Sequence, residues 1–108
     1  MEKKDLGKTS TGMQPNLEAF FCYLFGFITG LVFYLVEKEN KFVRFHAMQS
    51  ILVFGALFVA GFLILLIPVL NIAFLLAQTA LWIILMVMAY QGETFKLPIV
   101  GDIAQRNA

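Results

Sequence analysis

Residues 37–50, EKENKFVRFHAMQS, gather polar and charged side chains within an otherwise apolar chain. His46 and Ser50 are four residues apart, so on a helix they are neighbours, as a general base and a nucleophile must be. The surrounding sequence offers no pattern for the oxyanion-stabilising donors that acyl transfer also requires. We therefore expect no catalytic residues and a protein that is not an enzyme.

The chain also lacks the residues from which metal and cofactor sites are built. Its single histidine and single cysteine cannot supply the four ligands of a zinc site, and no glycine-rich phosphate loop occurs. The cysteine, Cys22, lies inside an apolar run, where a thiol is expected to be unreactive. We expect no metal and no cofactor, and the net charge of +1 gives no electrostatic reason for nucleic-acid binding.

The elements that position these residues are predicted by the long uncharged runs. Hydrophobic residues make up 60% of the chain and charged residues 14%, and residues 19–36 and 45–92 contain no Asp, Glu, Lys or Arg. Soluble domains average about 45–50% apolar and about 25% charged residues. Apolar runs of about 18 or more residues are typical of transmembrane helices, so the sequence predicts an integral membrane protein that contacts the lipid bilayer.

We expect an all-α integral membrane protein folded as a three-helix transmembrane bundle. Pro68 interrupts the second long run because proline lacks an amide donor and clashes with the preceding turn of a helix. The predicted helices are residues 17–36, 42–67 and 70–90, between a flexible polar tail at 1–16 and a C-terminal tail at 91–108.

Three spans place the 37–41 turn and the C-terminal tail on the same side of the membrane. That side carries five of the Lys and Arg residues and the other side carries three. The positive-inside rule then favours a multi-pass protein of the cell membrane with the EKENK turn and the C-terminus in the cytoplasm.

Small residues at helical spacing predict faces where helices approach closely. Packing rather than hydrophobicity holds membrane helices together, and Gly26 and Gly30 form a GxxxG pattern. Packing within the bundle is the simpler use of such faces, and contact with a second copy is the alternative. The residues predicted to pack helices are Gly26, Gly30, Ala56, Ala60, Ala73 and Ala77.

Helical periodicity divides the polar residues of the second predicted helix between two faces. Lys41 and Arg44 are expected to point outward to lipid headgroups, while His46, Gln49 and Ser50 point inward. Glu37 ends the small-residue face of the first helix on the same side of the membrane. A Glu37–His46 polar pair and full hydration of both groups are the two alternatives.

Gln78 lies near the middle of the third predicted helix, on the face opposite Ala73 and Ala77 and close to Asn71. An amide that faces lipid is costly, so Gln78 should have a partner. Oligomerisation or a further subunit would supply one. The alternative is a hydrogen bond within the bundle, with the face assignment reversed.

The RFHAMQ element resembles a motif of the Tic import components (twenty-kilodalton type) of the chloroplast inner envelope and of the small prokaryotic membrane proteins of unknown function grouped with them. In that family an Arg-Phe-His-x-Met element opens a membrane helix, and a proline followed by Asp and Ala occurs in the tail. The resemblance covers residues 17–104, although the plastid proteins are usually described with four spans. The interaction motif that it implies is Arg44, Phe45, His46, Met48, Gln49, Pro98 and Asp102, with Ile103 and Ala104 completing the tail match.

We therefore expect a small polytopic membrane protein without catalytic activity. It acts by packing its helices against those of further copies, as a homo-oligomer, or against those of a larger membrane complex. The resemblance implies a role in protein translocation. The alternative is a subunit of an oligomeric channel or transporter, whose pore would be lined by polar residues such as Gln78.

Overall fold

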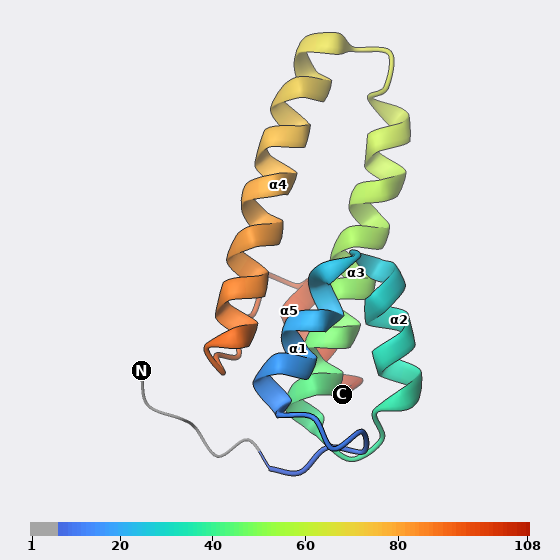
Figure 1. Cartoon of the computed structure of the whole chain (residues 1–108). Helices are drawn as coiled ribbons and strands as arrows, with labels where there is room; N and C mark the ends of the chain where they lie inside the picture. Colours follow the sequence, from blue (N-terminus) through green and yellow to red (C-terminus); the bar gives the residue numbers. More distant parts are fainter. Residues whose placement is uncertain (1–6) are drawn as a thin grey trace.

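The structure, a computed structural model, describes residues 7–108, and helices are the only regular secondary structure over that range (Figure 1). The all-α prediction is confirmed for this part of the chain. Its helices are α1 (Pro15–Leu24), α2 (Phe27–Val36), α3 (Lys41–Leu63), α4 (Pro68–Tyr90) and α5 (Val100–Arg106).

The two long helices α3 and α4 form a hairpin. Each has 23 residues and is long and apolar enough to cross a membrane. At 1.5 Å per residue each extends about 34 Å, which matches a hydrocarbon layer of about 30 Å. Pro68 occupies the first turn of α4, where its missing amide would have had no partner in the helix. The turn therefore falls at residues 64–67, a few residues earlier than expected.

The predicted single helix over residues 17–36 is wrong, because the chain breaks into α1 and α2, each of ten residues. Gly26 lies at the break with φ +63°, a conformation that glycine adopts without penalty. The hydroxyl of Thr29 holds the turn by donating to the carbonyl of Cys22 (3.2 Å) and accepting the amide of Phe25 (3.1 Å). Ten helical residues extend about 15 Å, half the thickness of the hydrocarbon layer. In place of a three-helix transmembrane bundle, two long helices carry a short helical hairpin (Figure 1).

This hairpin changes the relation between the ends of the chain. Residues 7–14, the α2–α3 loop and the C-terminus lie at the end of the molecule away from the α3–α4 turn (Figure 1). The amide of Ser10 donates to the carboxylate of Glu37 in that loop at 2.9 Å. The two tails therefore lie on the same side, and not on opposite sides as three spans would require. Of the tail predicted to be flexible, residues 1–6 lie outside the described residues, whereas Lys8 and Ser10 bond to the α2–α3 loop and Thr11 bonds to α1.

The core sits where α1 packs against α3 and α4. Its buried members are Ala19, Tyr23, Val53, Phe54, Leu85 and Ala89. Toward the α3–α4 turn the large side chains are exposed instead, as at Leu66 (92%) and Val69 (82%). A contiguous apolar surface of this kind is suited to lipid.

The contact between α2 and α3 leads to a test of the packing. A Cβ atom at Gly30 would lie 2.8 Å from Ser50 Oγ and 3.0 Å from the carbonyl oxygen of Ala47. We expect Gly30→Ala to lower the free energy of unfolding by about 1–3 kcal/mol, because overpacking forces the helices apart. Circular dichroism during denaturant unfolding in detergent measures this change.

Gly55 provides the matched control, because a Cβ atom there would meet nothing within 4 Å. Gly55→Ala should leave stability unchanged or raise it by up to about 1 kcal/mol, since alanine favours the helix. Equal effects of the two substitutions would show that close approach at Gly30 is not what holds α2 against α3.

Candidate functional site: polar clusters buried at one end of the bundle

The first turns of α3 place three polar side chains on one buried face. Asn40 caps the helix by accepting the amide of Val43 at 3.1 Å, which fixes where α3 begins. The spacing of His46, Gln49 and Ser50 then brings them to the same side of the helix, and the side chains are fully buried. The prediction that they point inward is confirmed.

His46 is the centre of a network that joins α3 to α1 and to the segment after α4. Its Nδ1 atom lies 2.7 Å from the hydroxyl of Tyr23, and its Nε2 atom lies 2.9 Å from the carbonyl oxygen of Glu93. A carbonyl only accepts, so Nε2 carries the hydrogen and Nδ1 accepts from Tyr23. The Tyr23 oxygen in turn accepts from Gln49 Nε2 at 3.0 Å. Each donated hydrogen among these side chains therefore has one acceptor, and the imidazole of His46 is neutral.

Gln49 extends the network along the chain that follows α4. Its Nε2 atom donates to the carbonyl of Phe95 at 2.9 Å, and its Oε1 atom accepts the amide of Leu97 at 3.1 Å. The side-chain amide thus pairs with backbone groups of this segment as a peptide group of a neighbouring strand would. Residues 93–97 are held by these bonds, which reasoning from the sequence missed because backbone atoms leave no signal in residue type. Tyr23 was missed because it lies within an apolar run.

Ser50 has different partners from His46. Its hydroxyl lies 2.8 Å from the carbonyl oxygens of both Cys22 and Gly26, at the break between α1 and α2. Cys22 is buried, with its sulfur 3.9 Å from the carbonyl oxygen of Val43. The side chains considered for a base and a nucleophile are therefore each engaged in holding helices together.

The alternative of a Glu37–His46 pair is not realised. The carboxylate of Glu37 accepts the backbone amides of Ser10 (2.9 Å), Glu39 (3.0 Å) and Asn40 (3.0 Å). The two ring nitrogens of His46 are bonded elsewhere, to Tyr23 and to the carbonyl of Glu93. Glu37 is fully buried, so full hydration is not realised either.

Arg44 does not point out to lipid headgroups as predicted. Its guanidinium donates to the carbonyls of Tyr34 (3.0 Å) and Glu37 (2.8 Å) and lies over the Tyr34 ring at 4.2 Å. These carbonyls lie at the end of α2, where the last carbonyls of a helix receive no N–H donor from within the helix, and a cation there is favourable. Lys41 is exposed, as expected.

The remaining residues of the motif differ in exposure. Phe45 is buried with its ring 5.0 Å from that of His46, and Met48 is half-buried. Pro98 and Asp102 are exposed, and Asp102 lies 3.9 Å from the ammonium group of Lys96. The helical half of the motif therefore stabilises the bundle, and a role of the motif in binding a partner stays a prediction.

The predicted packing residues fall into two groups. Gly26 and Gly30 lie at the contact with α3, where Gly26 meets Phe54 and Gly30 meets Ser50. Ala56, Ala73 and Ala77 are exposed and Ala60 is half-buried, so these alanines do not form the interior of the bundle. The face assignment of α4 is reversed.

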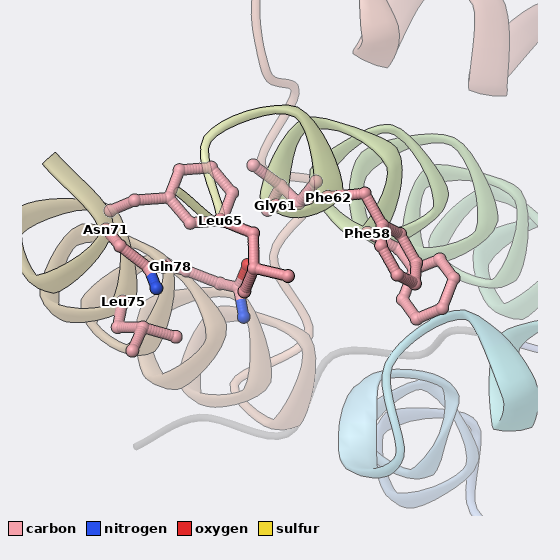
Figure 2. A pocket seen from close by; sticks show the side chains of 9 residues that line it. Phe58, Gly61, Phe62, Leu65, Asn71, Leu75 and Gln78 are labelled. Carbon is pink, nitrogen blue, oxygen red and sulfur yellow. The ribbon is translucent and has the colours of Figure 1, made fainter. Parts of the chain in front are cut away.

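The reversed face of α4 borders a pocket of about 390 Å³ near the α3–α4 turn (Figure 2). Asn71 and Gln78 reach it from α4, with apolar side chains around them. Neither side-chain amide makes a hydrogen bond with the described residues. We call this the α3–α4 groove; its lining is Leu57, Phe58, Gly61, Phe62, Leu65, Asn71, Phe74, Leu75 and Gln78.

Within residues 7–108, no three His, Cys, Asp or Glu side chains lie together in a way that would hold a metal ion. The two long apolar helices and the polar clusters at one end define a small helical membrane protein. Over residues 9–104 the chain belongs to the family described as the magnetosome magnetite crystal formation protein family. Magnetite formation is what that family is named for and is not a finding about this chain.

The curated relatives are archaeal membrane proteins. A UPF0132 membrane protein of Methanocaldococcus jannaschii is 52% identical over 104 residues, which cover 94% of each chain. A second from that organism is 43% identical over 88% of this chain and 71% of its own length. A UPF0132 membrane protein of Archaeoglobus fulgidus is 40% identical over 87% of this chain and 95% of its own. No solved structure matches.

These comparisons support the coarser part of the resemblance seen in the sequence, a small prokaryotic membrane protein of unknown function. They give no support to the likeness to the Tic import components.

The Gln49 bonds lead to a prediction. In Gln49→Leu the carbonyl of Phe95 and the amide of Leu97 lose their partner, and each unsatisfied buried group costs about 1–3 kcal/mol. We expect residues 93–97 to be cleaved faster by a protease in detergent micelles, with a lower midpoint of thermal unfolding.

Gln105→Leu is the control, because Gln105 is exposed on α5 and takes no part in the network. If both variants resist proteolysis like the parent chain, the Gln49 amide does not hold this segment.

Proposed function

We infer that the protein is a non-enzymatic membrane protein that assembles with further copies of itself through the α3–α4 groove. The observation that carries this proposal is the pair of amides, Asn71 and Gln78, without hydrogen-bond partners among the described residues. Gln78 is the eleventh residue of α4, about 15 Å from its start and hence near the middle of a bilayer. An amide at that depth requires a partner, since lipid offers none.

A second copy is the partner that fits this chemistry best. An amide side chain both donates and accepts, so two identical amides can satisfy one another across a symmetry axis. The end of the hairpin near the α3–α4 turn is not covered by α1 or α2 (Figure 1), which leaves room for a neighbouring helix there. Ala73 and Ala77, exposed on the other side of α4, allow a further close contact. A larger membrane complex is the runner-up, and it would meet the same groups.

The orientation follows from the position of the charges. With two spans, the tails and the α2–α3 loop share one side, and the α3–α4 turn lies within residues 45–92, which hold no Lys or Arg. The described cations on the shared side are Lys8, Lys38, Lys41, Arg44, Lys96 and Arg106. This asymmetry favours a multi-pass protein of the cell membrane with both ends and the loop in the cytoplasm. The loop and the C-terminus thus keep the cytoplasmic side expected from the sequence. The N-terminus, which three spans would place outside, moves to that same side.

A channel subunit is the second candidate, because Asn71 and Gln78 would line a pore made by several copies. Ion flux through liposomes that contain the purified protein tests it: flux that Gln78→Leu abolishes would favour the channel over a purely structural assembly. Protein translocation has no support in the contacts or in the comparisons and forms no part of this function.

Gln78→Leu tests the assembly itself. A hydrogen bond between membrane helices contributes about 0.6 kcal/mol on average and up to about 2 kcal/mol, so the dissociation constant should rise about 3- to 30-fold. Resonance energy transfer between donor- and acceptor-labelled copies in liposomes measures the change.

Thr79→Val is the matched control, since Thr79 is exposed and its hydroxyl donates to the carbonyl of Leu75 in its own helix at 2.7 Å. Unchanged association in both Gln78→Leu and the Asn71→Leu/Gln78→Leu double variant would refute self-assembly through the groove.

Cysteine labelling of intact cells tests the orientation. The natural Cys22 is fully buried, so it should stay silent toward a membrane-impermeant maleimide. Leu66→Cys, in the α3–α4 turn, should be labelled from outside, whereas Lys38→Cys should be labelled only after lysis. The reverse pattern would place the ends of the chain outside the cell.

A further inference from the structure

Two glutamates are buried together at the charged end of the molecule. Glu18 comes from α1 and Glu37 from the α2–α3 loop, and both side chains have 0% exposure. Residues before α1 lie across them: the hydroxyl of Thr11 donates to Glu18 Oε1, and the amide of Ser10 lies 2.9 Å from both oxygens of Glu37. Ser10 and Thr11 are themselves exposed, so they form the outer cover of the pair.

The surroundings of the two carboxyl groups differ in one respect that decides where a proton sits. Glu37 accepts backbone amides from Ser10, Glu39 and Asn40, and hydrogen bonds to a carboxylate favour its charged form. Glu18 Oε2 is buried and receives no hydrogen bond from the described residues. Two buried carboxylates side by side repel one another, so the pair holds one proton, on Glu18.

The acidities agree with this placement. Burial, and then the interaction with Glu37, raises the pKa of Glu18 to about 7. Burial opposes ionisation of Glu37, but the hydrogen bonds from Glu18 and from the backbone amides outweigh it and lower the pKa of Glu37 to about 2.

The other ionisable groups nearby do not neutralise the pair. Burial raises the pKa of the Cys22 thiol, one turn along α1, so the thiol is uncharged. Arg44 of α3 donates to the backbone carbonyl of Glu37 rather than to its carboxylate. Lys8 contributes its backbone carbonyl, which accepts from the side-chain amide of Asn40 at 3.0 Å.

We propose that Glu18 and Glu37 form a proton-binding site that fastens residues 8–11 to the helical bundle and releases them when the proton is lost. When Glu18 is neutral it donates to Glu37, and the amide of Ser10 completes the closed arrangement. When Glu18 ionises, two negative charges meet beneath the cover, and opening lets water reach both. The site goes beyond the proposed assembly and is independent of it, because the α3–α4 groove lies toward the other end of the hairpin.

The direction of the pH dependence follows from the two shifts. Glu18 keeps its proton to a higher pH in the closed form than a free glutamic acid, whose pKa is 4.5, so closure weakens as the pH rises from 4.5 through about 7. Glu37 acts in the opposite sense: its contribution is complete above 4.5 and is lost as the pH falls toward about 2. Closure is therefore firmest in mild acid, near the ordinary pKa of a glutamic acid.

Amide hydrogen exchange on the full chain in lipid nanodiscs tests the proposal. The probes are the amides that bond to Glu37, those of Ser10, Glu39 and Asn40. Glu18→Gln imitates the protonated acid and cannot ionise, so the ratio of parent to variant exchange removes the intrinsic effect of pH. We expect a ratio near one at about pH 5 that rises up to about tenfold per pH unit above the pKa of Glu18.

Glu39→Gln is the matched control, because Glu39 lies in the same loop with an exposed side chain. It should follow the parent chain at every pH. A ratio that stays constant across the pH range would overturn the proposal.

A second measurement covers the case in which Glu18→Gln does not fold. Carbon-13 NMR of labelled glutamate side chains follows the titration of Glu18 directly. Its midpoint should lie near neutral pH in the parent chain and fall in Glu37→Gln, where the neighbouring charge is gone. A Glu18 midpoint near 4.5 in the parent would exclude a proton held by the pair. Neither measurement depends on oligomerisation, so its failure is distinguishable from failure of the proposed assembly.

Discussion

The need to pair backbone groups where helices are interrupted governs this structure. Inside a membrane, water is not available to bond a free carbonyl or amide, so each break in a helix requires a partner. Here the partners come from one face of α3. Ser50 serves the break between α1 and α2, Arg44 serves the end of α2, and Gln49 serves the irregular chain after α4. The start of α3 therefore organises the other segments around it.

This arrangement gives the molecule two unlike halves. At the charged end, α1, α2 and the chain after α4 surround α3, and the polar groups find partners within the protein. Toward the α3–α4 turn only the two long helices remain, and Asn71 and Gln78 face a groove without a bonding partner in the described chain. The charged end is closed, and its buried carboxyl pair is suited to respond to the pH of the aqueous side. The end near the α3–α4 turn is open and suited to contact with another helix within the membrane.

Much of the fold was accessible to reasoning from the sequence, and the errors have physical causes. The uncharged runs gave the membrane character and the two long helices, and helical spacing gave the inward face of His46, Gln49 and Ser50. The break at Gly26 was missed because a glycine followed four residues later by Gly30 fits a continuous packing helix equally well. The face of α4 was reversed because small residues were assumed to face inward, whereas Asn71 and Gln78 do so.

Composition and periodicity alone determined that the chain is helical, that the runs predicted as helices 42–67 and 70–90 are long enough to cross a bilayer, and that polar chemistry is concentrated around His46. These properties depend on side chains that are near one another along the chain. Only the tertiary structure decided that Glu37 meets Glu18 and Ser10 rather than His46, and that both tails share one side. Those outcomes depend on a backbone reversal at one glycine and on bonds to backbone atoms, which every residue carries and which residue type therefore cannot reveal.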